Sequence, residues 1–86
     1  MTTEETGIHK TVHYKVYAKY SPEWNGFSVS YSFASPQGDD GTCQKYTEEL
    51  EKDGQLYIFK EESEALITGH NEAVNHISRV LNDISA

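Results

Sequence analysis

Histidine and cysteine are the side chains of this 86-residue chain that could most directly carry out chemistry. His70 and His76 are six residues apart, and that spacing does not place two side chains on one face of a helix. Cys43 is the single cysteine, so the chain forms neither an intrachain disulfide nor a cysteine-based metal cage. We therefore expect no cofactor and no metal site.

Two interpretations of His70 stay open, because it lies in the middle of an apolar helical pattern. It is either a ligand or buried pH switch, or a histidine held in the core by hydrogen bonds, and the second role is the commoner one. Cys43 has no neighbouring histidine in the sequence to activate it. The Gly-x-Ser-x-Gly elbow of serine hydrolases is also absent, so we expect that the chain is not an enzyme.

Acidic residues point more clearly to a function. The chain has 14 Asp and Glu against 7 Lys and Arg, a formal net charge of −7. This balance disfavours direct binding to nucleic acid or to an anionic membrane, and it favours basic protein partners. The acids are concentrated in residues 48–64, and the candidate partner-binding acids are Glu48, Glu49, Glu51, Asp53, Glu61, Glu62 and Glu64.

Two interpretations of these acids also stay open. Charges on an edge strand protect a sheet against edge-to-edge aggregation. Alternatively, the acids form an anionic surface that docks on a basic cleft in the place of nucleic acid. Alternate carboxylates on a strand are roughly 6.8 Å apart, whereas the phosphates of one DNA strand follow every ~3.4 Å. Mimicry of nucleic acid would therefore also need the acids at 61–64.

Residues 12–20 and 27–33 alternate between apolar and polar side chains, which is typical of strands with one buried face. Turn residues in the intervening SPEWNG segment predict an antiparallel hairpin. With Tyr20 opposite Phe27, every pair on one face is apolar. A shift of one residue would set Tyr20 against Ser28 and destroy this match.

Two aromatic residues of this hairpin are further candidates for partner contacts. Tyr17 belongs to the polar Lys and Ser face, and Trp24 lies at the predicted tip. Tyrosine and tryptophan are common anchors of protein interfaces.

A second hairpin is expected from 44–51 and 55–60, because Asp53-Gly54 is a type I′ turn signal. A short helix over 43–51 is the alternative. From residue 61 the period becomes helical, and one apolar stripe that includes Ile67 predicts a helix over about 62–84. Gly69 either allows close packing on the sheet or breaks this helix.

These elements predict a single α+β domain over 1–86. It has an antiparallel four-stranded sheet of two consecutive hairpins, with one C-terminal amphipathic helix packed on one face (ββββα). We expect residues 1–8 to be disordered and 35–42 to form a flexible loop.

A small, acidic, disulfide-free chain without catalytic motifs resembles the inhibitors that phages and mobile elements make against host defence enzymes. This resemblance implies a non-enzymatic protein that masks a basic surface of a larger, nucleic-acid-handling partner, as anti-CRISPR proteins do, by steric block or mimicry. The alternative is a regulatory or self-associating, antitoxin-like module that pairs through its sheet edge as a homodimer. The lack of disulfides and of an apolar N-terminal run predicts a cytoplasmic protein, in the host cytoplasm if phage-encoded.

Overall fold

The computed structural model describes residues 2–35 and 45–85, with side chains up to Asn82. Within these ranges the chain has the predicted ββββα fold, a four-stranded antiparallel sheet followed by one helix, together with a small two-stranded ribbon. The expected flexible loop 35–42, apart from the buried Ser35, and Cys43 lie outside the described residues. The elements are β1 (Thr2–His9), β2 (Val12–Ser21), β3 (Gly26–Ala34), β4 (Lys45–Glu49), β5 (Glu51–Lys52), β6 (Gln55–Leu56) and α1 (Glu62–Ser85).

The β2–β3 hairpin confirms the register predicted from the alternating pattern. Tyr20 pairs with Phe27, and Tyr14 pairs with Phe33. The face that carries the apolar residues of both strands is largely buried. The match between the apolar faces of the two strands therefore determines their register.

The N-terminal segment is a strand, so the prediction that residues 1–8 are disordered is wrong. β1 pairs with β2 along its whole length. The two strands are joined at Lys10 and Thr11, whose φ angles are 49° and 69°. Positive φ at both central residues is characteristic of the type I′ turn, which Asn-Gly or Asp-Gly usually marks. The residues of β1 on the helix side of the sheet carry no apolar pattern: they are Thr3, Glu5, Gly7 and His9.

The second predicted hairpin is only partly correct. The strand predicted at 44–51 exists as β4, but it pairs with β3. The fourth strand of the sheet is therefore β1 rather than 55–60. Pairing around Asp53-Gly54 is limited to the β5–β6 ribbon, where φ values of 54° and 79° fit the expected type I′ turn. The chain then returns to the sheet at Phe59, which exchanges backbone hydrogen bonds of 2.7 and 2.8 Å with Phe27.

The helix α1 matches the predicted span and continues through Gly69. Gly69 is buried against the sheet. A Cβ atom at this position would lie 2.5 Å from Val16 Cγ1 and 2.8 Å from Val29 Cγ2. Because these distances are too short for any side chain, glycine allows the helix backbone to approach β2 and β3 closely.

This approach also determines which face of the helix is buried. Leu66 and Ile77 are buried, but Ile67 is 61% exposed, so its place in the predicted stripe is wrong. Ile67 precedes Gly69 by two residues, or about 200° around the helix at roughly 100° per residue. Turning Gly69 toward the sheet therefore turns Ile67 toward solvent.

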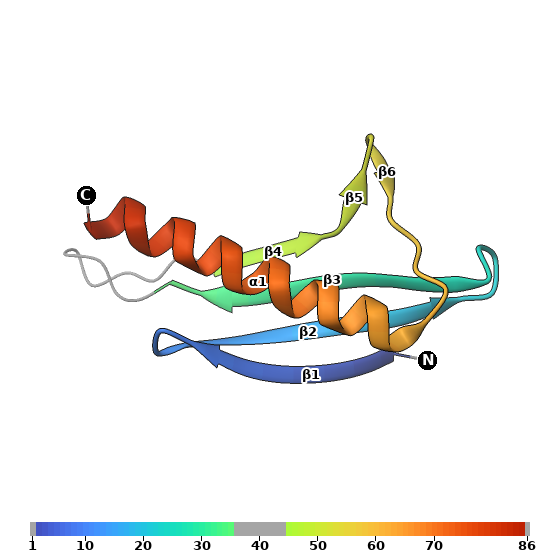
Figure 1. The fold of residues 1–86 in the computed structure, drawn as a ribbon, viewed down its shortest axis with the longest axis horizontal. Coiled ribbons are helices and arrows are strands. Elements are labelled where there is room, and N and C mark those ends of the chain that lie inside the picture. Colours follow the sequence, from blue (N-terminus) through green and yellow to red (C-terminus); the bar gives the residue numbers. More distant parts are fainter. Residues whose placement is uncertain (1, 36–44, 86) are drawn as a thin grey trace.

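Figure 1 shows α1 lying along one face of the sheet, and its contacts are mainly with β2 and β3. The core fills the space between these two layers. In the described part of the chain no element covers the opposite face, which we call the open face. Among the residues described, no helix has an apolar stretch long enough to cross a membrane.

Replacing Gly69 by alanine should destabilise the protein, although alanine is the better helix former by about 1 kcal/mol. The new methyl group would force Val16 and Val29 apart, and overpacking of this kind typically costs about 1–3 kcal/mol. The free energy of unfolding, measured with urea, tests this. Asn71→Ala, at an exposed position of the same helix, is the control. A stabilised Gly69→Ala protein would show that the helix is not in close contact with the sheet.

Candidate functional site

The acids predicted to form one partner-binding cluster divide into two groups. Glu48, Glu49, Glu51 and Asp53 lie on β4 and on the β5–β6 ribbon, and all four are exposed. In Figure 1 this ribbon projects from the β4 side of the sheet, away from the rest of the molecule. We call these four residues the acidic hairpin group.

The second group consists of Glu61, Glu62 and Glu64 at the start of α1, and these residues are also exposed. Figure 1 places the start of the helix at the end of the sheet where the chain begins, well away from the tip of the ribbon. The two groups do not come together because 55–60 does not form a sheet strand beside β4. The role of the second group in partner binding stays a prediction.

The two predicted aromatic contacts lie in two further places. Trp24 is 62% exposed in the turn between β2 and β3. Tyr17 is half-buried on the open face. It pairs across the sheet with Ser30, which in turn pairs with Glu49, so Tyr17 and one predicted acid share a row of this face.

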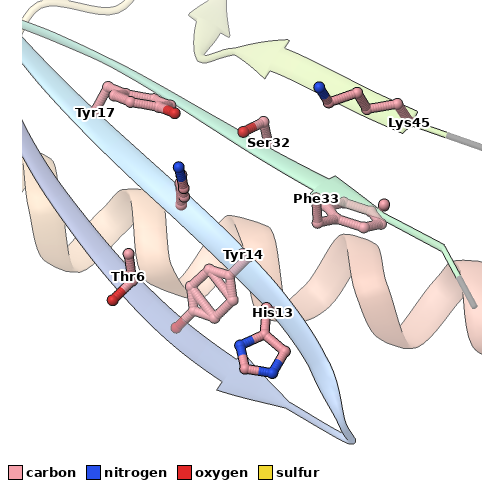
Figure 2. Close-up of a pocket in the computed structure, with 9 residues that line it drawn as sticks. Thr6, His13, Tyr14, Tyr17, Ser32, Phe33 and Lys45 are labelled. Atoms are coloured by element: carbon pink, nitrogen blue, oxygen red, sulfur yellow. The ribbon is translucent and has the colours of Figure 1, made fainter.

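The open face contains a hollow of about 450 Å³ that the sequence did not reveal. It extends across all four strands of the sheet, and short serine side chains on β3 lie between longer side chains on β2 and β4. Figure 2 shows the Tyr17 hydroxyl and the Lys45 ammonium group extending toward Ser32 from opposite sides. The polar residues of its lining are Thr6, His13, Lys15, Tyr17, Ser32 and Lys45.

The register explains why these groups converge. Lys15 of β2 pairs with Thr6 of β1 on one side and with Ser32 of β3 on the other. Lys45 is the first residue of β4. Sequence reasoning placed Lys15 and Tyr17 on this face, but it missed the hollow because it did not predict β1 and did not pair β4 with β3.

The charge of the hollow is opposite to that of the whole chain. Lys15 and Lys45 are exposed ammonium groups in its lining, and His13 is exposed beside them. Glu4 forms an ion pair with one of these groups, since its Oε1 lies 3.9 Å from Lys15 Nζ. An exposed pair at this distance contributes little to stability, so Lys15 is available to another anion.

His70 lies between the helix and the sheet and is held there by hydrogen bonds. This is the second of the two roles that its sequence context left open. Its Nδ1 is 2.7 Å from the Tyr14 hydroxyl, and its Nε2 is 2.9 Å from Glu5 Oε1. A neutral ring with its proton on Nε2 satisfies both contacts: Tyr14 donates to Nδ1, and Nε2–H donates to the carboxylate. The three side chains thus connect α1, β2 and β1.

Two other histidines make similar connections near the other end of α1. The Tyr31 hydroxyl and His76 Nδ1 share a hydrogen bond of 2.8 Å, and the His76 ring packs edge-on against Phe33. His9 Nε2 and Ser78 Oγ are 2.9 Å apart. Together these contacts join the helix to β1 at the outer edge of the sheet and to β3 in its centre.

The phenol of Tyr14 is the most buried member of the Tyr14–His70–Glu5 arrangement. Tyr14 is only 7% exposed, whereas the side chains of His70 and Glu5 are 28% and 47% exposed. Burial raises the pKa of Tyr14 above 10, and the nearby Glu5 charge raises it further. Both effects keep the phenol protonated. Within the described residues, no three His, Cys, Asp or Glu side chains are grouped in a way that could hold a metal ion.

Comparisons with protein-family models, with curated proteins and with solved structures found no match to this chain. The acidic hairpin group and the hollow of the open face are the two surfaces of the molecule that bear on its function.

Stability should decline as the pH rises above about 10. Burial raises the pKa of Tyr31, as it does that of Tyr14, and the charges of Glu48 and Glu72 add to the effect while Arg79 opposes it. Above the ordinary tyrosine pKa, the folded state binds protons that the unfolded state has lost, so unfolding becomes more favourable with increasing pH. Urea denaturation between about pH 8 and pH 11.5 measures this decline.

The double variant Tyr14→Phe/Tyr31→Phe separates these phenols from the other titrating groups. It should be less stable near pH 8, because two hydrogen bonds are lost, but its decline above pH 10 should be shallower. A decline as steep as that of the natural sequence would contradict the assignment.

Proposed function

We propose that this chain is a non-enzymatic binding protein that docks through its acidic hairpin group on a basic surface of a larger protein. The observation that carries the proposal is the exposure of four acids on β4 and on the β5–β6 ribbon, and this ribbon projects from the sheet (Figure 1). Such charges attract a basic partner over a distance and orient it before contact.

Apolar side chains beside these acids supply the second component of an interface. Leu56 and Tyr57 are 37% and 36% exposed at the base of the ribbon. Lys52 Nζ lies over one face of the Tyr57 ring, 5.7 Å from its centre, in a cation–π contact. Aromatic and apolar centres surrounded by charges are typical of protein interfaces.

We propose that the partner is a nucleic-acid-handling protein of a host defence system. The chain would inhibit this protein in the way that phage-encoded inhibitors block their target enzymes. Steric block is favoured over mimicry of nucleic acid. Glu48 and Glu49 are consecutive residues of a strand and point to opposite faces of the sheet. Mimicry of nucleic acid would also need the acids at the start of α1, and the start of α1 lies away from the tip of the ribbon (Figure 1).

Self-association through the sheet edge is the second candidate. β1 is eight residues long and pairs on one side only within the described part of the chain. An edge strand of this length is a template for pairing with another chain. Sedimentation at micromolar concentration would show a dimer without any partner if this candidate is right.

Charge reversal on the ribbon tests the first candidate. Tagged protein is used to capture partners from cell extract, and the affinity of the purified partner is then measured at increasing salt. Glu51→Lys/Asp53→Lys should weaken binding by at least about tenfold, and the affinity of the natural sequence should fall steeply with salt.

Glu4→Lys/Glu23→Lys provides the matched control, since it makes the same change in net charge at exposed positions outside both groups of acids. This control should bind almost as well as the natural sequence. Binding that ignores salt, or equal losses in both double variants, would count against docking through the acidic hairpin group.

A further inference from the structure

The hollow of the open face gathers hydrogen-bond donors from separate strands around one point. Lys15 and Ser32 are directly paired neighbours on β2 and β3. Tyr17 and Lys45 extend toward Ser32 from opposite sides in Figure 2. Two ammonium groups and two hydroxyls therefore surround a space that is open to solvent, in a chain whose overall charge is negative.

From this geometry we infer that the hollow binds a small organic phosphate. The phosphoryl group lies between the Lys15 and Lys45 ammonium groups and accepts hydrogen bonds from the hydroxyls of Ser32 and Tyr17. This is a ligand site separate from the acidic hairpin group, and it does not depend on the protein partner proposed above.

The donor set favours a phosphate over a carboxylate. A phosphomonoester carries nearly two negative charges and three acceptor oxygens, so it can engage donors from several directions at once. Carboxylates are matched best by the planar fork of arginine, which the hollow lacks, whereas lysine binds phosphate as a point charge. Two separated lysines with hydroxyls between them fit the tetrahedral anion.

The size of the hollow indicates that the phosphate carries an organic group. About 450 Å³ lies within the range of small-molecule sites, roughly 300–1,000 Å³, and is far more than one phosphate ion fills. The organic group would extend toward Thr6 and His13, which line the hollow on the β1–β2 side.

A variant of Glu4 should change the affinity for phosphate in the direction opposite to that of the lysine variants. Its carboxylate lies 3.9 Å from Lys15 Nζ and competes with any anion for that ammonium group. Removing its charge should therefore strengthen phosphate binding, whereas removing a lysine of the hollow should weaken it.

Phenyl phosphate is a suitable probe, with phenol as its uncharged counterpart and inorganic phosphate as the minimal anion. Titrations of the full chain at constant ionic strength, followed by amide NMR shifts, should show saturable changes at Lys15, Ser32 and Lys45. Phenyl phosphate should bind more tightly than inorganic phosphate, and phenol should leave these amides unchanged.

Four exposed-residue variants complete the test. Lys15→Gln and Lys45→Gln should each raise the dissociation constant about tenfold, the loss expected for one charge-assisted contact. Glu4→Gln should lower it. Lys19→Gln removes an equal charge from the same face, four residues along β2 and outside the hollow, and should change it less than twofold.

Absence of saturable shifts with both phosphates would overturn the inference. So would shifts confined to other surfaces, or a loss in Lys19→Gln equal to that in Lys15→Gln, because attraction would then reflect general charge. Since all four positions are exposed, their amide spectra away from the hollow should match that of the natural sequence and confirm that the variants are folded.

Discussion

The close contact of Gly69 with Val16 and Val29 is the constraint on which the rest of the structure depends. It places the backbone of α1 directly on the two central strands, and both valines are almost fully buried beneath it. In a domain of this size one core must supply nearly all the stability. A helix held this close uses the available apolar surface efficiently, and it leaves the acidic hairpin group and the open face free for binding.

Polar contacts then extend the packing beyond the central strands. β1 offers the helix Glu5 and His9 in place of apolar side chains, and these residues bond to His70 and Ser78. The outer strand is thus held by its backbone pairing with β2 and by histidine-mediated hydrogen bonds. Such contacts require defined geometry, which specifies where β1 lies without adding apolar surface to it.

The sequence was sufficient where apolar residues carry the pattern. It predicted the register of β2 and β3, the turn at Asp53-Gly54 and the span of α1, because each depends on alternation, helical period or a turn residue with positive φ. It failed at β1 for physical reasons. The helix-side residues of that strand are polar, and its type I′ turn uses Lys10 and Thr11 instead of asparagine or glycine.

The candidate sites follow the same division. Exposure of the acids was predictable from composition, and the turn signals placed Trp24 at the hairpin tip without deciding whether its side chain is exposed. The separation of the acids into two groups was not predictable, since it depends on which strand lies beside β4. The hollow was also beyond prediction, because it needs residues of four strands in register. Its only sequence signal is the alternation of small and cationic side chains on the polar faces of 12–20 and 27–33.

The most direct test of this account is a nuclear Overhauser measurement on the labelled chain in solution. It should show contacts from the Gly69 α-protons to the methyl groups of Val16 and Val29, and none from any α1 proton to the β-protons of Ser30 or Ser32 on the open face. Contacts between α1 and those serines, or none between Gly69 and the two valines, would contradict the arrangement on which both proposed binding surfaces rest.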